Sequence, residues 1–531
     1  MRATDRAVPV ESMDIGAWIA RRSAIGPSRP AVTYEGNTWT YADFAERIDR
    51  LAAELRAGGV QIGDRVGYFG PNHPAFLVTL FACARAGAIF VPLNFRLTGR
   101  ELTYIARDAG LHTLIADTGL TAVIDPVRSD LALSRTISLG AIGGWEILDD
   151  LLAVRGPISE PEHPEPSDVA IIMYTSGTTG LPKGAMLTHG NLFWNNVNAL
   201  LSFDVTSSDV TYVAAPLFHI GGLNVTTLLT LQKGGHVIVT PSFDPVRALH
   251  DIARHRVTTM FGVPAMYLFM RQAPEFVTAD LSSLRYLICG GAPVPEPLMR
   301  AYSARGIPFA QGYGLTETAP LALVMGIDEA SRKIGAAGSK VLPLSDVRLV
   351  DADNAGVSPG EPGEICVRGP QIMAGYWNNP AATAAAIDGQ GWFHTGDVGR
   401  EDDDGYVYVV DRLKDMAITG GENVYPAEVE SVLYSHPDVV EVAVLGLPDP
   451  KWGEAVTAVV AVKASATVTL DDLRDFASGH LARYKLPQRL EFVASLPRNP
   501  SGKVLKNQLR ERFAEAVPSD RGQVSGRLDR Q

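Results

Sequence analysis

The chain has 531 residues, of which 46% are hydrophobic and 20% charged, and its formal net charge is -12. This balance is typical of a soluble globular protein and excludes an intrinsically disordered chain. The acidic charge argues against a nucleic-acid or anionic-membrane surface, because such surfaces need clustered Lys and Arg. The N-terminus lacks a long apolar segment, and no later stretch offers about 20 uninterrupted apolar residues. We therefore expect a cytoplasmic protein without a transmembrane segment.

The first half of the chain alternates helix and strand signals. Residues 40–59 have the pattern of an amphipathic helix that ends at a glycine pair, and residues 64–70 have that of a strand. Residues 73–93 predict a helix followed by a buried strand, and residues 113–117 and 236–240 predict further strands. This alternation indicates an α/β fold whose parallel-rich sheets are sandwiched by helices.

The second half of the chain shows a different pattern of secondary-structure signals. Residues 158–168 are rich in Pro and Glu and predict a loop before the strand at residues 169–174. After Gly363, short antiparallel strands separated by Gly and Asp turns indicate a β-barrel-like subdomain. We place the domain boundary after residue 412, so that residues 1–412 form the large domain and residues 413–531 a small α+β domain. The polar tail from about residue 518 is expected to be disordered.

A loop of glycines and hydroxyl residues, YTSGTTGLPKG, follows the strand at residues 169–174. Glycines let backbone N–H groups converge on phosphate oxygens, Ser and Thr add neutral donors, and a lysine supplies positive charge. The loop therefore predicts a phosphate-binding site, although it is not the GxxxxGK[ST] P-loop. The candidate residues are Thr175, Ser176, Gly177, Thr178, Thr179, Gly180 and Lys183.

This loop resembles the signature of the adenylate-forming superfamily, which includes acyl-CoA synthetases, luciferases and adenylation domains of peptide synthetases. Further resemblance recurs in order from about Thr40 to Lys506, and the whole chain most resembles bacterial medium- and long-chain fatty acid–CoA ligases. The resemblance implies an acid–CoA ligase that uses ATP, Mg²⁺ and coenzyme A. Such an enzyme converts a carboxylic acid to acyl-AMP with release of pyrophosphate, and then forms a CoA thioester with release of AMP.

The resemblance also assigns nucleotide contacts. In QGYGLTET, residues 311–318, it places adenine on Tyr313, the α-phosphate at the Thr316 hydroxyl and magnesium at Glu317, a hard oxygen ligand that suits this ion. Asp397 in GWFHTGD and Arg412 would hold the ribose hydroxyls. The remaining implied nucleotide-binding residues are Gly290, Gly291, Ala292 and Pro293 of GGAP, with Gln311, Gly312 and Gly314.

A second set of residues is expected to line the acyl pocket. His219 of PLFH is placed against this pocket by the resemblance, although a lone histidine after an apolar run is more often a core residue. Small residues and the absence of acids predict an apolar tunnel and argue against an amino-acid site. The candidate pocket residues are His219, Gly221, Gly222, Val263, Gly312 and Gly314.

The C-terminal domain supplies residues for both half-reactions. The resemblance makes Lys414 the hinge of a mobile domain, with Lys503 bridging the substrate carboxylate and the α-phosphate in the first pose. In the second pose, Gly420 and Gly421 would form the wall of the CoA channel. Trp452 would stack on the CoA adenine, with core packing as the alternative. Leu486 stands where some relatives carry Arg, which weakens this CoA assignment.

Several alternatives remain. The acid could be an aromatic or polycyclic compound of natural-product metabolism, because such ligases share every motif above. The chain could also load a carrier protein or run only one half-reaction, whereas a non-catalytic nucleotide-binding protein is disfavoured because Lys183, Glu317 and Lys503 are all present. A homodimer is the family-level expectation for assembly. The three cysteines, Cys83, Cys289 and Cys366, lack metal-ligand spacing and are interpreted as buried packing residues.

Overall fold

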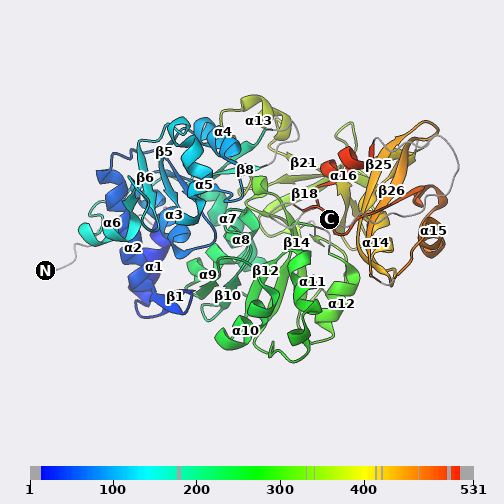
Figure 1. Ribbon diagram of the computed structural model, residues 1–531, viewed down its shortest axis with the longest axis horizontal. Helices are drawn as coiled ribbons and strands as arrows, with labels where there is room; N and C mark the ends of the chain where they lie inside the picture. The colour runs from blue at the N-terminus through cyan, green and yellow to red at the C-terminus, as the bar shows by residue number, and fades with distance from the viewer. Residues whose placement is uncertain are drawn as a thin grey trace. The chain divides into compact units, whose positions relative to one another are not determined.

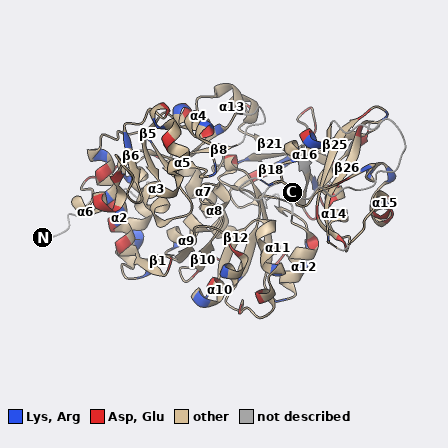
Figure 2. Cartoon of the chain, viewed as in Figure 1, with Lys and Arg blue, Asp and Glu red and all other residues tan. Residues whose placement is uncertain are grey.

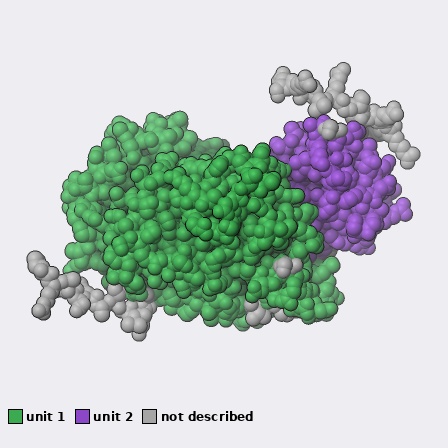
Figure 3. All heavy atoms as spheres, turned by 90° about the horizontal axis from the view of Figure 1, so that it is seen from below, with its two compact units in different colours: residues 1–409 green, residues 410–531 purple. Residues whose placement is uncertain are grey.

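The computed structural model describes residues 13–175, 181–292, 294–330, 332–339, 341–412, 415–419, 422–464, 466–498 and 504–514. The chain forms two compact units, Met1–Val409 and Val410–Gln531 (Figure 3). The division falls within strand β22 (Tyr406–Arg412), at whose end we expect the domain boundary from the sequence.

A large mixed sheet begins in the first unit. In the described part of the chain it has fourteen strands in the order β17-β18-β19-β21-β22-β16-β15-β14-β13-β12-β10-β11-β1-β2. The neighbouring strands from β14 to β1 are parallel, whereas the described pairs from β14–β15 onward are antiparallel. The sequence predicts antiparallel strands after Gly363, but antiparallel pairing already begins at β15. Its strands are β1 (Pro30–Tyr34), β2 (Asn37–Thr40), β10 (Val210–Val213), β11 (His236–Val239), β12 (Thr259–Gly262), β13 (Tyr286–Cys289), β14 (Phe309–Gly314), β15 (Leu321–Val324), β16 (Gly338–Ser339), β17 (Val341–Leu342), β18 (Ser345–Val350), β19 (Pro362–Arg368), β21 (Phe393–Glu401) and β22.

A second sheet of the first unit carries the glycine-rich loop. Over the described residues it has eight strands in the order β20-β9-β8-β4-β3-β5-β6-β7, parallel from β8 to β7. Its strands are β3 (Arg65–Phe69), β4 (Ile89–Leu93), β5 (Leu111–Ala116), β6 (Arg135–Ser138), β7 (Glu146–Ile147), β8 (Val169–Thr175), β9 (Lys183–Thr188) and β20 (Gly375–Tyr376).

Helices cover these sheets. Helix α7 contacts β15 of the large sheet and β9 of the second, so it lies between them near the middle of the unit (Figure 1). The helices are α1 (Gly16–Ile25), α2 (Tyr41–Ala57), α3 (Pro74–Ala86), α4 (Gly99–Ala109), α5 (Thr121–Ile124), α6 (Leu148–Val154), α7 (His189–Ser202), α8 (Ile220–Asn224), α9 (Thr227–Lys233), α10 (Pro245–His255), α11 (Pro264–Gln272), α12 (Glu296–Ser303) and α13 (Pro380–Ala386), with 3-10 turns at Thr118–Leu120, Asp125–Asp130, Pro274–Val277 and Thr316–Thr318.

Local sequence signals explain why these elements begin and end where they do. Helix α2 starts with a capping box in which Thr40 and Asp43 satisfy each other's backbone N–H groups. Helix α3 has Pro74 in its first turn and ends at Gly87, which adopts a left-handed conformation. Every residue of α3 and of the following strand β4 is buried. The predicted helix and buried strand over residues 73–93 are therefore confirmed.

The second unit is built around a small mixed sheet. Its described strands are β23 (Ala417–Thr419), β24 (Glu422–Val424), β25 (Val439–Asp449), β26 (Gly453–Val462) and β27 (Arg489–Phe492), and β26 pairs with β25, β23 and β27. Strand β27 pairs with β26 in parallel, and the other described pairs of this sheet are antiparallel. The helices are α14 (Pro426–Leu433), α15 (Leu470–Ser478) and α16 (Lys506–Ala514), with a 3-10 turn at Arg483–Lys485. Apolar residues of α14, α15 and the long β25–β26 hairpin form its main core.

Both signs of charge are interspersed along the chain. Helices α2, α4 and α10 each carry acidic and basic residues (Figure 2). None of the helices in the described residues combines the length and apolar character that a membrane span requires. The three cysteines are buried and free, which confirms that they form no disulfide.

Candidate active site

The predicted site residues of the large sheet gather at one edge. Strands β10, β12, β13 and β14 are mutually parallel neighbours, so their carboxyl ends lie at the same edge of the sheet. His219 follows β10, Val263 follows β12, Gly290 follows β13, and Gly312 and Gly314 end β14. In open α/β sheets, ligands bind in the crevice beyond the carboxyl ends of the strands. The topology therefore collects these segments where a ligand is expected.

The glycine-rich loop closes a hairpin of the second sheet. Thr175 at the end of β8 pairs with Lys183 at the start of β9, so both ends of the loop are fixed by the ladder. Lys183 Nζ lies 5.1 Å from the centre of the Tyr376 ring, which is within reach of a cation–π interaction. The predicted residues Ser176, Gly177, Thr178, Thr179 and Gly180 lie outside the described residues.

The Thr316–Thr318 turn holds the candidate metal ligand. Glu317 is 8% exposed, and its Oε1 accepts a hydrogen bond of 2.8 Å from the Tyr376 hydroxyl. Burial and the Glu317 carboxylate raise the pKa of the Tyr376 hydroxyl, which keeps it protonated as a donor. The Asn224 amide donates to the Ala319 carbonyl at 2.7 Å and anchors the end of the turn. Thr316 and Glu317 therefore stand on a turn that side chains from distant segments hold in place.

The residues predicted for adenine and ribose are brought together across 84 positions of sequence. The Tyr313 hydroxyl donates to Asp397 Oδ2 at 2.7 Å, and Asp397 is 6% exposed. The backbone N–H of Asp397 donates to Thr395 Oγ1, and that of Gly396 donates to Glu364 Oε1 at 2.9 Å. Asp397 thus has a fixed position next to the predicted stacking tyrosine.

Glycines at the sheet edge permit close packing that a side chain would prevent. A Cβ on Gly290 would lie 2.9 Å from the Gly312 carbonyl oxygen, and Gly291 has φ of +83°, a conformation that favours glycine. A Cβ on Gly221 would lie 2.8 Å from the Phe261 ring, and one on Gly222 would lie 2.3 Å from the Pro216 carbonyl oxygen. These distances explain why the predicted adenine and acyl segments each contain a glycine pair, because a side chain at Gly290, Gly221 or Gly222 would overlap its neighbours.

His219 is half-buried at the start of α8, and its Nε2 atom is enclosed. Among the described residues, this Nε2 has no hydrogen-bond partner, and the ring packs on Phe218 with 4.4 Å between centroids. Desolvation of the ring, with a smaller contribution from Arg96, lowers the pKa of His219 to about 4. A neutral imidazole with an enclosed, unpartnered nitrogen is suited to one hydrogen bond with a ligand.

We expect the pH dependence of adenylation to be independent of His219. Since its pKa lies near 4, this imidazole has already lost its proton well below neutral pH. In His219→Asn, the profile of kcat/KM between about pH 6 and 8 should keep its wild-type shape, while KM for the acid rises. The profile is measured by quantifying the product formed at fixed times at each pH, for the wild type and for the variant. An acidic limb present in the wild type and missing from the variant would contradict it.

The C-terminal candidates are only partly described. Pro293 of the first unit and Lys414, Gly420, Gly421 and Lys503 of the second lie outside the described residues. Arg412 ends β22, and only its backbone is described.

Trp452 and Leu486 differ in burial. Trp452 is 42% exposed in the turn between β25 and β26, and Lys451 Nζ lies 4.6 Å from the centre of its ring. Core packing of Trp452, the alternative left open by the sequence, is therefore wrong. Leu486 is buried in the core of this unit, so it offers no nucleotide contact of its own.

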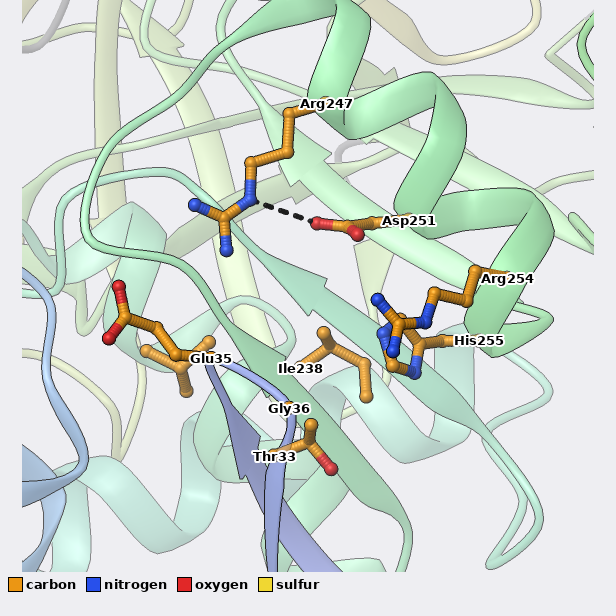
Figure 4. A pocket seen from close by; sticks show the side chains of 9 residues that line it. Thr33, Glu35, Gly36, Ile238, Arg247, Asp251, Arg254 and His255 are labelled. Atoms are coloured by element: carbon orange, nitrogen blue, oxygen red, sulfur yellow. Dashed lines mark hydrogen bonds and ion pairs between the residues drawn. The ribbon is translucent and has the colours of Figure 1, made fainter.

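One separate pocket of about 250 Å³ lies away from these residues, between the β1–β2 turn, β11 and α10 (Figure 4). Arg247, Arg254 and His255 approach it, and Arg247 Nε donates to Asp251 Oδ2 at 3.3 Å. Among the described residues that line this pocket, none belongs to the predicted site.

Sequence reasoning missed several residues of the site. The Phe261 ring lies next to the Cα atoms of Gly221 and Gly290. Tyr376 contacts both Glu317 and Lys183. Asn224 donates a hydrogen bond to the turn that carries Glu317. Phe261 could have been found, because it lies two residues before Val263, which is a predicted pocket residue. Tyr376 lies in a short strand 59 residues after Glu317, and no local pattern links the two.

Comparison with known proteins gives matches over nearly the whole chain. Residues 19–377 match the AMP-binding enzyme family, and residues 428–503 match the AMP-binding enzyme C-terminal domain. A feruloyl-CoA synthase from Amycolatopsis sp. is 48% identical over 95% of this chain and 100% of its own length. An indoleacetate–CoA ligase from Aromatoleum aromaticum is 41% identical over 94% of this chain and 98% of its own length. The long-chain-fatty-acid–CoA ligase FadD13 from Mycobacterium tuberculosis is 38% identical over 95% of this chain and 99% of its own length.

A solved structure agrees with the fold. The ATP-bound crystal structure of MatB from Rhodopseudomonas palustris superposes with a TM-score of 0.88 at 35% identity, covering 95% of this chain and 99% of that one. The predicted α/β architecture, with a large sheet domain and a small C-terminal domain, is thereby confirmed.

Proposed function

Because this chain belongs to the AMP-binding enzyme family and is an acyl-CoA synthetase, we propose that it joins an aromatic carboxylic acid to coenzyme A. The observation that carries the choice of acid is the 48% identity, over 95% of the chain, to a feruloyl-CoA synthase. Identity to the long-chain-fatty-acid ligase is lower, at 38% over the same share. The fatty acid expected from the sequence resemblance is therefore replaced by an aromatic acid as the first candidate.

The buried Phe261 ring supports an aromatic acid. Phe261 is 8% exposed and lies against the positions of Gly221 and Gly290 in the region proposed as the acyl pocket. An aromatic side chain offers its edge or face to a substrate ring, which is worth about 0.5–1.5 kcal/mol beyond area burial. The neutral His219, with Nε2 unpartnered in the described residues, supplies one polar group in this apolar region.

The first half-reaction needs charge neutralisation more than proton transfer. The carboxylate is already ionised, so its oxygen bonds to the α-phosphorus of ATP while the bond to pyrophosphate breaks. The barrier comes mainly from repulsion between anions, and Lys183 and Lys503 are proposed to offset it. Tyr313 and Asp397 would hold adenine and ribose, with Arg412 as a second ribose contact. In the second half-reaction, the CoA sulfur bonds to the acyl carbon and AMP leaves.

Glu317 fits the magnesium ion that the family implies. Its carboxylate is buried, one oxygen is oriented by Tyr376, and carboxylate oxygen is a hard ligand of the kind Mg²⁺ prefers. When bound, the ion would supply positive charge to the phosphate oxygens. Thr316, on the same turn, would offer its hydroxyl to the α-phosphate.

A panel of acids tests the proposed substrate class. Purified protein is incubated with ATP, Mg²⁺ and ferulate, indoleacetate, octanoate or palmitate, with and without CoA, and acyl-AMP and acyl-CoA are detected by mass spectrometry. Acyl-CoA formed from the aromatic acids at the highest kcat/KM supports the proposal. A preference for octanoate or palmitate overturns it, and acyl-AMP that accumulates despite CoA indicates a carrier protein as the acceptor.

We expect Phe261→Ala to change which acids are used. Removing the ring opens space beside Gly221, so kcat/KM for the preferred aromatic acid should fall by roughly 10-fold or more while longer acids gain relative to it. Phe276→Ala is a matched control, because Phe276 is equally buried in the same core cluster but lies on the 3-10 turn Pro274–Val277, whereas Phe261 lies in β12. Equal changes of selectivity in both variants would remove Phe261 from the acyl pocket.

A further inference from the structure

Three metal-ligating side chains meet on strands β19 and β21, outside the contacts assigned to ATP and the acid. Cys366 and His394 are direct partners in the antiparallel ladder, and Glu364 lies two residues before Cys366. Cys366 Sγ is 3.4 Å from His394 Nδ1, and Nδ1 is 2.9 Å from Glu364 Oε2. Within the described part of the chain, the ligand atoms of these three residues all lie within 4.8 Å of one another.

We propose that Cys366, His394 and Glu364 form a binding site for a thiophilic divalent cation such as Zn²⁺, with water as the fourth ligand. Zinc binds sulfur, imidazole nitrogen and carboxylate oxygen at about 2.0–2.3 Å, which in a tetrahedron puts neighbouring ligand atoms roughly 3.3–3.6 Å apart. The 3.4 Å between Sγ and Nδ1 already meets this spacing. The 2.9 Å between Nδ1 and Oε2 must widen by about half an ångström, which rotation of the Glu364 side chain can provide.

A second carboxylate orients the histidine for this role. Asp388 Oδ1 accepts backbone hydrogen bonds from Gln390 at 2.8 Å and Trp392 at 2.9 Å, and Oδ2 faces His394 Nε2 at 3.7 Å. Metal-bound histidines almost always present their other ring nitrogen to a carboxylate or carbonyl, which fixes the tautomer. Here Nε2 faces Asp388, while Nδ1 is directed at Cys366 and Glu364.

The local charge also suits a divalent cation. The thiolate of Cys366 and the carboxylates of Glu364 and Asp388 carry three negative charges, and Arg348, 3.5 Å from Asp388, carries one positive charge. The remaining charge of about -2 would be balanced by one divalent cation. The side chains of Glu364 and His394 are 21% and 23% exposed, so an ion has a path from solvent.

Zinc binds the thiolate form of cysteine, so Zn²⁺ binding at Cys366 releases the thiol proton. The site is linked to the nucleotide region, because Glu364 Oε1 accepts the Gly396 N–H directly before Asp397.

Cobalt and zinc titrations of the full-length protein test the site. After removal of metals by chelation, protein is titrated with Co²⁺ or Zn²⁺ in excess Mg²⁺ and without nucleotide. We expect about one Zn²⁺ per chain and a cobalt–thiolate absorption band in the near ultraviolet. Cys83→Ala should behave like the wild type, because Cys83 is buried in helix α3 away from these ligands.

Ligand variants separate this site from adventitious binding. Cys366→Ser should abolish the cobalt–thiolate band and weaken Zn²⁺ binding. His394→Asn should weaken Zn²⁺ binding as much as Cys366→Ser does. Asp388→Asn should weaken it by roughly 10–100-fold, as expected for the loss of an orienting partner. Wild-type protein without the thiolate band, or Cys366→Ser with wild-type zinc affinity, overturns the proposal. His394→Asn provides the comparison if Cys366→Ser does not fold.

Discussion

In Lys503→Ala, adenylation should slow by roughly 10²–10³-fold, as expected for the loss of one transition-state charge contact. The carboxylate and the α-phosphate are both anions, and the lysine assigned between them lowers their repulsion where charge develops. The rate is measured by ATP–pyrophosphate exchange with the preferred acid. Because the lysine is proposed to act only in the first pose, conversion of supplied acyl-AMP to acyl-CoA should be largely retained.

A substitution at Gly421 gives the reciprocal result and serves as the matched comparison. The bulky side chain in Gly421→Trp should block the predicted CoA channel, so thioester formation fails while pyrophosphate exchange continues. Together the two variants separate the half-reactions. Equal loss of both half-reactions in Lys503→Ala, or an unaffected thioester rate in Gly421→Trp, would contradict the two-pose assignment.

The elements of the first unit were predictable because local signals agree with the global fold. The run at residues 73–93 is apolar enough to be read as a buried helix and strand, and α3 and β4 are indeed buried throughout. Thr40 stands where a capping residue is expected, and it caps α2. Such signals act within a few residues, so they can be read without knowing the tertiary structure.

The site was predictable only where a motif carries it. Tyr313 and Asp397 were both assigned from motifs, but the hydrogen bond between them depends on how the segments containing β14 and β21 come together. Tyr376 and Phe261 were missed because their roles arise from tertiary contacts with Glu317 and with the Gly221 position. No periodicity or spacing encodes such contacts.

Strand register brings Cys366 next to His394, and the spacing of these residues in the sequence does not reveal it. Cys366 lies 28 residues from His394, which is unlike any compact metal motif. The antiparallel pairing of β19 with β21 places the two residues opposite each other, and a register irregularity between Glu364 and Cys366 lets two residues separated by one position approach the same histidine. The predicted burial of Cys366 is confirmed, and the proposed metal site would give this residue a second role.

Asp397→Ala should lower kcat/KM for ATP by about 10²–10³-fold, because the two proposed hydrogen bonds from ribose hydroxyls to this buried carboxyl group are worth roughly 3–4 kcal/mol together. Asp397 is 6% exposed and oriented by Tyr313. Steady-state pyrophosphate exchange with varied ATP measures the effect, which should fall mainly on ATP and leave KM for the acid nearly unchanged.

Tyr313→Phe provides the control for this assignment. It keeps the ring proposed to stack on adenine and removes only the hydroxyl that donates to Asp397 at 2.7 Å. The expected loss in kcat/KM for ATP is about 10-fold, the value of one hydrogen bond to a charged acceptor. If Asp397→Ala and Tyr313→Phe lose the same amount, Asp397 acts by positioning Tyr313 and the direct ribose contact is wrong. A much larger loss in Asp397→Ala assigns the carboxylate to the nucleotide itself.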